Sequence, residues 1–142
     1  MLSENQLLNH IYQTAEMGGE GIRSVLKYTE EPKLADALNS QLTEYEKLQN
    51  AAGSLLQARG EPPKGLSPVA KASSEVMSTV KAMADRSPAN IAEMMIQGST
   101  MGVTKSLRTI RGCDLRDENV RRLADKLLKT EQANIEEMKR FL

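Results

Sequence analysis

The chain has 142 residues, a length that predicts a single domain over 1–142, able to bury a core without a disulfide or a metal ion. The charges of its 19 basic and 19 acidic residues cancel, and it has no Trp and only one Phe. This balance of charge and the scarcity of aromatic side chains argue against nucleic-acid binding. The single cysteine, Cys113, excludes an intramolecular disulfide and suits a reducing compartment. The N-terminus lacks a signal-peptide pattern, and the uncharged stretch 94–104 is too short to span a bilayer. We therefore expect a cytoplasmic protein.

The first predicted helix begins at Ser3 and continues to about Tyr28. Ser3 with Gln6 three residues later forms a capping box, in which each side chain accepts a hydrogen bond from a free backbone N–H. Three glycines fall inside this helix, where each costs up to ~1 kcal/mol relative to alanine. A phosphate-binding loop needs a preceding strand, and none is predicted here. We interpret the cluster as a place of close helix approach or a local bulge, formed by Gly18, Gly19 and Gly21.

The later helices are predicted from their caps and from apolar residues at helical spacing. A second helix is expected from Pro32 to Gly60. Two Ser-Pro pairs then start a short helix over 68–85 and a long one over 88–111. The last helix is expected to open at Asp114 and Asp117 and to run to the C-terminus. No segment shows sustained alternation of period two, so the chain is predicted to be all-α.

The short helix decides the predicted topology. At 1.5 Å per residue it covers ~27 Å, most of the length of the long helices. If it runs back along the bundle, the second and fourth helices become parallel. The expected fold is an antiparallel four-helix bundle with a fifth, short crossover helix.

Several polar residues fall on or beside the apolar stripes that should face the core. Glu131 is the clearest, because it continues the helical spacing of Leu127 and Leu128 and precedes Ile135 and Met138. A carboxylate there needs donors, a metal ion or a raised pKa. The expected inner polar set is Gln13, Glu16, Gln41, Tyr45, Gln97, Glu131 and Asn134.

This pattern resembles the ferritin-like superfamily, in which two helices each give one Glu and two others each give Glu-x-x-His to a pair of metal ions. Glu16 matches the single Glu of the first helix, and Glu131-x-x-Asn134 has the spacing of the last helix's motif. The resemblance covers nearly the whole chain as topology. It extends to bacterial ferritin-like proteins with amide-rich centres, and it implies a fold rather than an activity.

The chain departs from the motif of that superfamily at its histidines. Asn134 replaces one histidine, and in Gln41-x-x-Glu44 the residue Glu44 stands where the other belongs. Gln97 replaces the Glu of the third helix. Oxygen ligands suit hard cations such as manganese or iron, whereas a redox di-iron site normally includes imidazole. The candidate metal ligands implied by the resemblance are Glu16, Glu44, Gln97, Glu131 and Asn134.

Three interpretations of the inner polar set remain open: a structural hydrogen-bond network, a metal site and a small-ligand pocket. The first is favoured, because facing amides and carboxylates can fix helix register. The five central methionines are explained as core filler by their helical spacing. The sequence thus favours a non-enzymatic structural or interaction bundle without a cofactor, with an iron- or manganese-binding ferritin-like protein or oxidoreductase as the alternative. The Gly98-x-x-x-Gly102 pair can pack against a helix of the same chain or of a second subunit, and we expect a homodimer.

Overall fold

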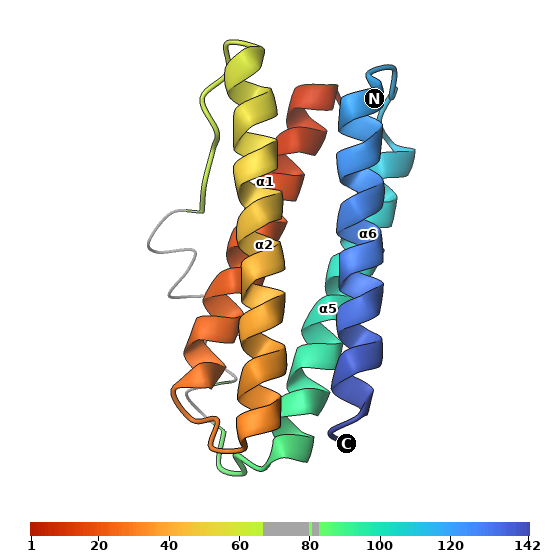
Figure 1. Cartoon of the computed structure of the whole chain (residues 1–142). Coiled ribbons are helices and arrows are strands. Elements are labelled where there is room, and N and C mark those ends of the chain that lie inside the picture. The colour runs from red at the N-terminus through yellow and green to blue at the C-terminus, as the bar shows by residue number, and fades with distance from the viewer. Residues whose placement is uncertain (67–79, 81–82) are drawn as a thin grey trace.

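The computed structural model of the chain is a bundle of four long helices (Figure 1). They are α1 (Glu4–Leu26), α2 (Pro32–Ala58), α5 (Pro88–Arg111) and α6 (Glu118–Lys139). The structure describes residues 1–66, 80 and 83–142. The expected short helix over 68–85 lies almost wholly outside these residues, and 83–87, which are described, are not helical. No strand occurs in the described part of the chain, so its all-α class is confirmed there.

The four helices form two antiparallel hairpins that face each other. α1 packs mainly on α2, and α5 packs mainly on α6; between the hairpins α1 faces α5 and α2 faces α6. α2 ends at one end of the bundle and α5 starts at the other, so these two helices run in the same direction, as the sequence predicted (Figure 1). None of α1, α2, α5 and α6 combines the length and the hydrophobicity that a membrane-spanning helix needs.

The helix ends follow local capping chemistry, with one correction. Ser3 and Gln6 make the expected capping box at α1, and Ser87 caps α5 ahead of its Pro at the first helical position. Gly60 follows α2 with φ +74°, the left-handed conformation that favours glycine. The last helix starts later than predicted. Its N-cap is Asp117, which accepts from the Asn119 N–H, whereas Asp114 lies outside the helix and bonds the side chain of Arg116.

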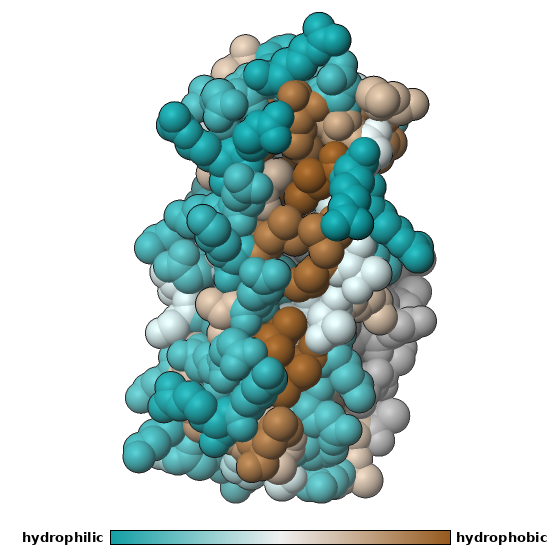
Figure 2. All heavy atoms as spheres, turned by 90° about the vertical axis from the view of Figure 1, so that its right-hand side faces the viewer, coloured by the Kyte–Doolittle hydropathy of each residue, from teal (hydrophilic) through white to brown (hydrophobic). Residues whose placement is uncertain are grey.

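One side of the molecule has an apolar stripe. Figure 2 shows hydrophobic side chains running down the face that lies at the right of Figure 1, bordered by hydrophilic ones. Four apolar residues of α5 and α6 are half-buried yet are not among those packed against the core cluster. We call this set the α5–α6 stripe; it consists of Val103, Leu107, Leu128 and Ile135.

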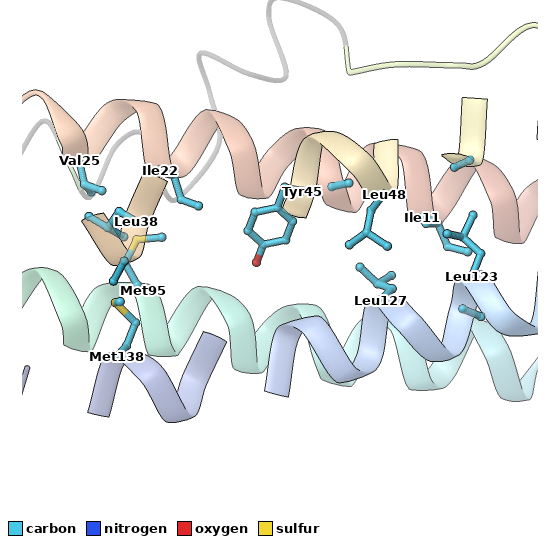
Figure 3. Close-up of a cluster of buried hydrophobic side chains, with 14 of the residues drawn as sticks. Ile11, Ile22, Val25, Leu38, Tyr45, Leu48, Met95, Leu123, Leu127 and Met138 are labelled. Carbon is cyan, nitrogen blue, oxygen red and sulfur yellow. The ribbon is translucent and has the colours of Figure 1, made fainter. Parts of the chain in front are cut away.

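The core between the hairpins is apolar except at its middle. Figure 3 shows buried side chains from all four helices in two groups, and Tyr45 lies between these groups. Its hydroxyl points from α2 toward the α5–α6 hairpin. Tyr45 is 4% exposed, so the phenol oxygen lies where only hydrogen-bonded polar groups are tolerated.

Charged side chains join three segments at one end of the bundle. The Arg59 guanidinium, just after α2, lies 2.9 Å from Oδ2 of Asp117 and 3.3 Å from Oε1 of Glu4. Oε2 of Glu4 accepts from the backbone N–H groups of Arg116 and Asp117, at 3.0 and 2.8 Å. Glu4 therefore ties the start of α1 to the segment that leads into α6.

Candidate functional site

The central polar feature is a hydrogen bond between the two hairpins. The Tyr45 hydroxyl on α2 donates to Oε1 of Glu131 on α6 over 2.9 Å. Both residues are buried, at 4% and 2% exposure. Glu131 therefore points inward, as its spacing predicted.

Two glycines make room for this pair. A Cβ built on Gly18 of α1 would lie 2.6 Å from the Tyr45 ring, and one on Gly102 of α5 would lie 3.2 Å from the Glu131 carboxylate. The first distance is one that Cβ atoms essentially never show, and the second is tighter than most Cβ contacts. Each glycine thus lets a large polar side chain of the neighbouring helix pack against bare backbone. The interpretation of the first glycine cluster as a place of close helix approach fits this geometry.

Burial sets the protonation of both members of the pair. Loss of solvation raises the pKa of Glu131 to about 7, against the opposing effect of the Tyr45 and Ser99 hydroxyls. Burial, with the nearby Glu131 charge, raises the pKa of Tyr45 as well, so the phenol stays protonated and acts as the donor. Near neutral pH the Glu131 carboxyl is therefore poised between its charged and neutral forms.

Two buried polar atoms, one in the pair and one beside it, lack partners in the part of the chain that the structure describes. Oε2 of Glu131 and Nδ2 of Asn134 have no hydrogen-bond partner among the described residues. Asn134, one turn further along α6, is 6% exposed. Such atoms are uncommon in folded proteins and call for an explanation by a water, an ion or a ligand.

A groove opens above the pair between α1 and α5. Its volume is about 850 Å³, and Tyr45 and Glu131 contribute to its lining from the far helices. Glycines of both near helices line it, where side chains would otherwise fill the space. A Cβ on Gly98 would meet no atom within 4 Å. The glycines that line the groove are Gly18, Gly21, Gly98 and Gly102.

The rim of the groove combines soft and basic groups. Nε2 of His10 lies 3.0 Å from the Ser106 hydroxyl and 3.3 Å from that of Thr14. Burial, and then the charge of Lys105, lower the pKa of His10, which favours the neutral imidazole. Four of the eight methionines line the same groove: Met17, Met94, Met95 and Met101.

The structure places the members of the expected inner polar set in different surroundings. Tyr45, Glu131 and Asn134 lie in the core. Gln41 is also buried, and it donates to Oε1 of Glu137 over 2.8 Å. Gln97 lies exposed at the groove.

The other two members of the set lie against the segment that follows α2. Gln13 donates to the carbonyl of Lys64, and Glu16 accepts from the backbone N–H of Leu66. Both side chains therefore help to hold residues 64–66 against α1.

The five candidate metal ligands are not brought together as a set. Glu16 bonds Leu66, and Glu44 is 41% exposed and pairs with Lys47 at 3.3 Å. Gln97 is exposed, whereas Glu131 and Asn134 share the core. The described residues contain no group of three or more His, Cys, Asp or Glu side chains that could hold a metal ion.

Sequence reasoning left a small-ligand pocket open but did not predict a groove between α1 and α5, although the signal was present. Gly98 and Gly102 are four residues apart, and Gly18 and Gly21 are three apart, so each pair shares one face of its helix. Two helix faces that carry only glycines, next to Tyr45 and Glu131 pointing into the core, indicate an unfilled space between the helices as well as a close contact. Ser99 and Ser106, buried on α5, were also not predicted.

Comparisons with known proteins support the fold. No family model matches the chain, and no curated protein matches its sequence. A DUF305 fragment from Deinococcus radiodurans has a TM-score of 0.74 and 18% identity, over 96% of this chain and 92% of that one. CopM in its Cu(II)-bound form has a TM-score of 0.73 and 14% identity, over 99% and 95%. The chain therefore shares a helical four-helix fold with these proteins, while its ferritin-like assignment remains a prediction.

Proposed function

We propose that this protein is a non-enzymatic binding protein that holds a small ligand in the groove between α1 and α5. The observation that supports this proposal most is the buried Tyr45–Glu131 pair at the floor of the groove, where Oε2 of Glu131 has no donor among residues 1–66, 80 and 83–142. A groove with apolar walls and a few converging polar groups is the usual form of a small-ligand site. The proposal joins two interpretations that the sequence left open, the inner polar network and the ligand pocket.

The test is to fill the groove without disturbing the core. Gly98→Leu adds a side chain where a Cβ has open space, so the bundle should still fold. Thr100→Leu is the matched control, because Thr100 is exposed on the same helix and does not line the groove. Ligand carried through native purification, detected by mass spectrometry after denaturation, should accompany the wild type and Thr100→Leu and be absent from Gly98→Leu. Equal ligand content in all three proteins would contradict a site in the groove.

A metal ion is the second candidate occupant. It is supported by the copper-bound state of CopM and by the presence of an imidazole and four thioethers at one groove. Thioether and imidazole ligands suit copper, whereas the oxygen ligands considered from the sequence suit iron or manganese. Metal content should be measured after growth with copper, iron, manganese or zinc. Loss of copper in Met94→Leu/Met101→Leu would support the thioether site, and loss of iron or manganese in Glu16→Ala/Glu131→Ala would support the oxygen site.

We also propose that the protein is a homodimer and that the α5–α6 stripe is its interface. Charge along α6 supports a two-fold, antiparallel pairing centred near Leu128. That pairing brings Arg121 opposite Glu136 of the second copy, and Glu118 opposite Lys139, in place of the exposed pairs that these residues form within one helix. In sedimentation velocity, Arg121→Glu should weaken the dimer and Arg121→Glu/Glu136→Arg should restore it. A wild type that sediments as a monomer at micromolar concentration would remove this proposal.

A further inference from the structure

The unpartnered oxygen of Glu131 restricts what a ligand of the groove must supply. The Tyr45 hydroxyl is committed to Oε1. The Ser99 hydroxyl lies near enough to lower the pKa of Glu131, but neither it nor any other donor in the described parts of the chain reaches Oε2 in hydrogen-bonding geometry. Glu131 is 2% exposed and cannot rely on bulk water. A buried carboxylate is stabilised most by a donor that also carries positive charge. The missing group is therefore a hydrogen-bond donor, and a cationic one matches the carboxylate best.

The Glu131 carboxylate lies directly beneath the groove: the residue contributes to its lining, while Oε2 itself is buried, so a ligand reaches Oε2 through a small shift of the side chains around it. The carboxylate packs against Gly102, where a Cβ would lie 3.2 Å from Oε2, and Gly102 itself lines the groove. Any larger residue at 102 would stand between the carboxylate and a ligand. Of the basic groups at the groove, Lys105 is exposed and His10 lies at the rim beside Ser106. Glu131, by contrast, is buried. A cation at the floor of the groove therefore contacts the carboxylate of Glu131, while the positive charge of Lys105 stays at the surface.

The walls of the groove determine the rest of the ligand. Methionine side chains are flexible and adapt to apolar groups of different shape. Met17 on α1 and Met94 and Met101 on α5 line the two walls, and the glycines between them leave bare backbone. Such walls bind hydrocarbon by burying apolar surface. They offer little to a hard, strongly hydrated cation.

We propose that the groove binds an organic amine, with its ammonium group on Glu131 and its hydrocarbon body between the methionines of α1 and α5. This inference rests on the proposed function and adds the chemical class of the ligand. The ammonium donates to Oε2 of Glu131, while Tyr45 continues to donate to Oε1. No covalent bond forms or breaks, and the groove selects by charge at its floor and by apolar contact along its walls.

The test uses three probes of equal length that differ at one end: hexylamine, 1-hexanol and hexanoate. Binding at pH 8 is followed by NMR of protein labelled at the methionine methyl groups. Methyl signals of Met17, Met94, Met95 and Met101 should shift with hexylamine, whereas that of Met1, which is 98% exposed, should not. Hexylamine should bind at least about tenfold more tightly than the other probes, a difference of about 1.4 kcal/mol.

Two variants separate the ammonium contact from the groove itself. Glu131→Gln keeps the shape of the side chain but removes its charge, so hexylamine should bind only as weakly as 1-hexanol while 1-hexanol is unaffected. Gly98→Leu should abolish binding of every probe, and Thr100→Leu should change none.

The outcomes distinguish the two levels of the proposal. If the three probes bind equally and only Gly98→Leu abolishes binding, the groove is a ligand site and the amine inference is overturned. If hexylamine binds equally well to wild type and Glu131→Gln, the ammonium does not lie on Glu131 and the inference is again overturned. If no probe shifts the groove methyl signals and purified protein carries no ligand, the proposed function fails as well, and a buried water explains the unpartnered oxygen.

Discussion

The phenol of Tyr45 and the carboxylate of Glu131 are 86 residues apart in sequence and 2.9 Å apart in the structure. They come from different hairpins, and each packs against a glycine of the helix beside it. The other contacts that Figure 3 shows between the hairpins are apolar and tolerate small shifts along the helix axes. The Tyr45–Glu131 hydrogen bond does not tolerate such shifts, because its donor and acceptor atoms must stay within about 3 Å of each other. Together with the Gln41–Glu137 and His10–Ser106 hydrogen bonds, this buried contact therefore fixes how the two hairpins are aligned.

Removing the phenol oxygen should destabilise the bundle by an amount that depends on pH. Tyr45→Phe leaves a buried carboxyl without its donor, and we expect a loss of roughly 1–3 kcal/mol at pH 8, where the group is charged. At pH 5 the carboxyl is neutral and the loss should be smaller. Tyr12→Phe is the control, because Tyr12 is half-buried and its hydroxyl has no hydrogen bond among those found in the described residues. Urea unfolding at both pH values measures the effect, and equal losses for the two variants would contradict it.

The contribution of Glu131 to the stability of the wild type should fall as the pH rises from about 4.5 to 7. The pKa of Glu131 is about 7 in the folded protein, against 4.5 as its ordinary value. Between these values the folded state binds more protons than the unfolded state, so the free energy of unfolding decreases with pH and then levels off. The complete change is roughly 3 kcal/mol.

Glu131→Gln should remove this pH dependence and should be the more stable protein above pH 7. The comparison must be made between these two proteins, because His10 acts in the opposite direction. Its pKa is lowered by burial and by Lys105, so its contribution is lost as the pH falls through 6.5. Both proteins keep His10. Parallel profiles of unfolding free energy between pH 5 and 8 would contradict the raised pKa of Glu131.

Substitution of glycine by alanine should have opposite effects at two helical positions. Gly98→Ala should stabilise the protein by up to about 1 kcal/mol, because the added methyl group meets no atom and alanine favours the helix. At Gly18 the same methyl group would lie 2.6 Å from the Tyr45 ring, and we expect a net loss of roughly 1–3 kcal/mol. Thermal unfolding of the two variants checks the sign of each change. A stabilising Gly18→Ala would mean that Tyr45 is free to move.

The helix ends were largely predictable, because capping depends on residues a few positions apart. Ser3 with Gln6, and Ser87 ahead of a proline, act through hydrogen bonds within one turn. The predicted start of α6 was wrong by a few residues, because Asp114 and Asp117 are both possible N-caps. The choice between them depends on distant groups: Arg59 and Glu4 bind Asp117 and its backbone N–H. Local sequence does not contain that information.

The inner polar set was predicted only in part, for a geometric reason. Spacing along a helix tells which residues share a face, but it does not tell what covers that face. Glu16 lies on a covered face of α1, and the cover is the segment after α2 rather than the bundle interior. Glu44 precedes Tyr45 by one position, about 100° around the helix, so the two cannot both point inward. Tyr45 takes the core, and Glu44 pairs with Lys47 at the surface.

Loss of the Glu4 carboxylate should loosen one end of the bundle. Glu4→Ala removes the acceptor for the backbone N–H groups of Arg116 and Asp117 and for the Arg59 guanidinium. We expect it to lower the free energy of unfolding by roughly 1–2 kcal/mol. Glu30→Ala removes an exposed acidic residue and should have almost no effect.

The contribution of the Glu4 contacts to stability should depend on pH in the acid range. The N–H groups of Asp117 and Arg116, followed by Arg59, lower the pKa of Glu4, so its contribution is present above 4.5 and is lost as the pH falls below that value. The difference in stability between wild type and Glu4→Ala should therefore shrink from pH 6 to pH 3. It should survive 0.5 M salt in part, because the two backbone hydrogen bonds are short-range contacts while the ion pair with Arg59 is screened. Urea unfolding at the two pH values measures this, and a difference that stays constant would show that Glu4 acts through packing rather than through its charge.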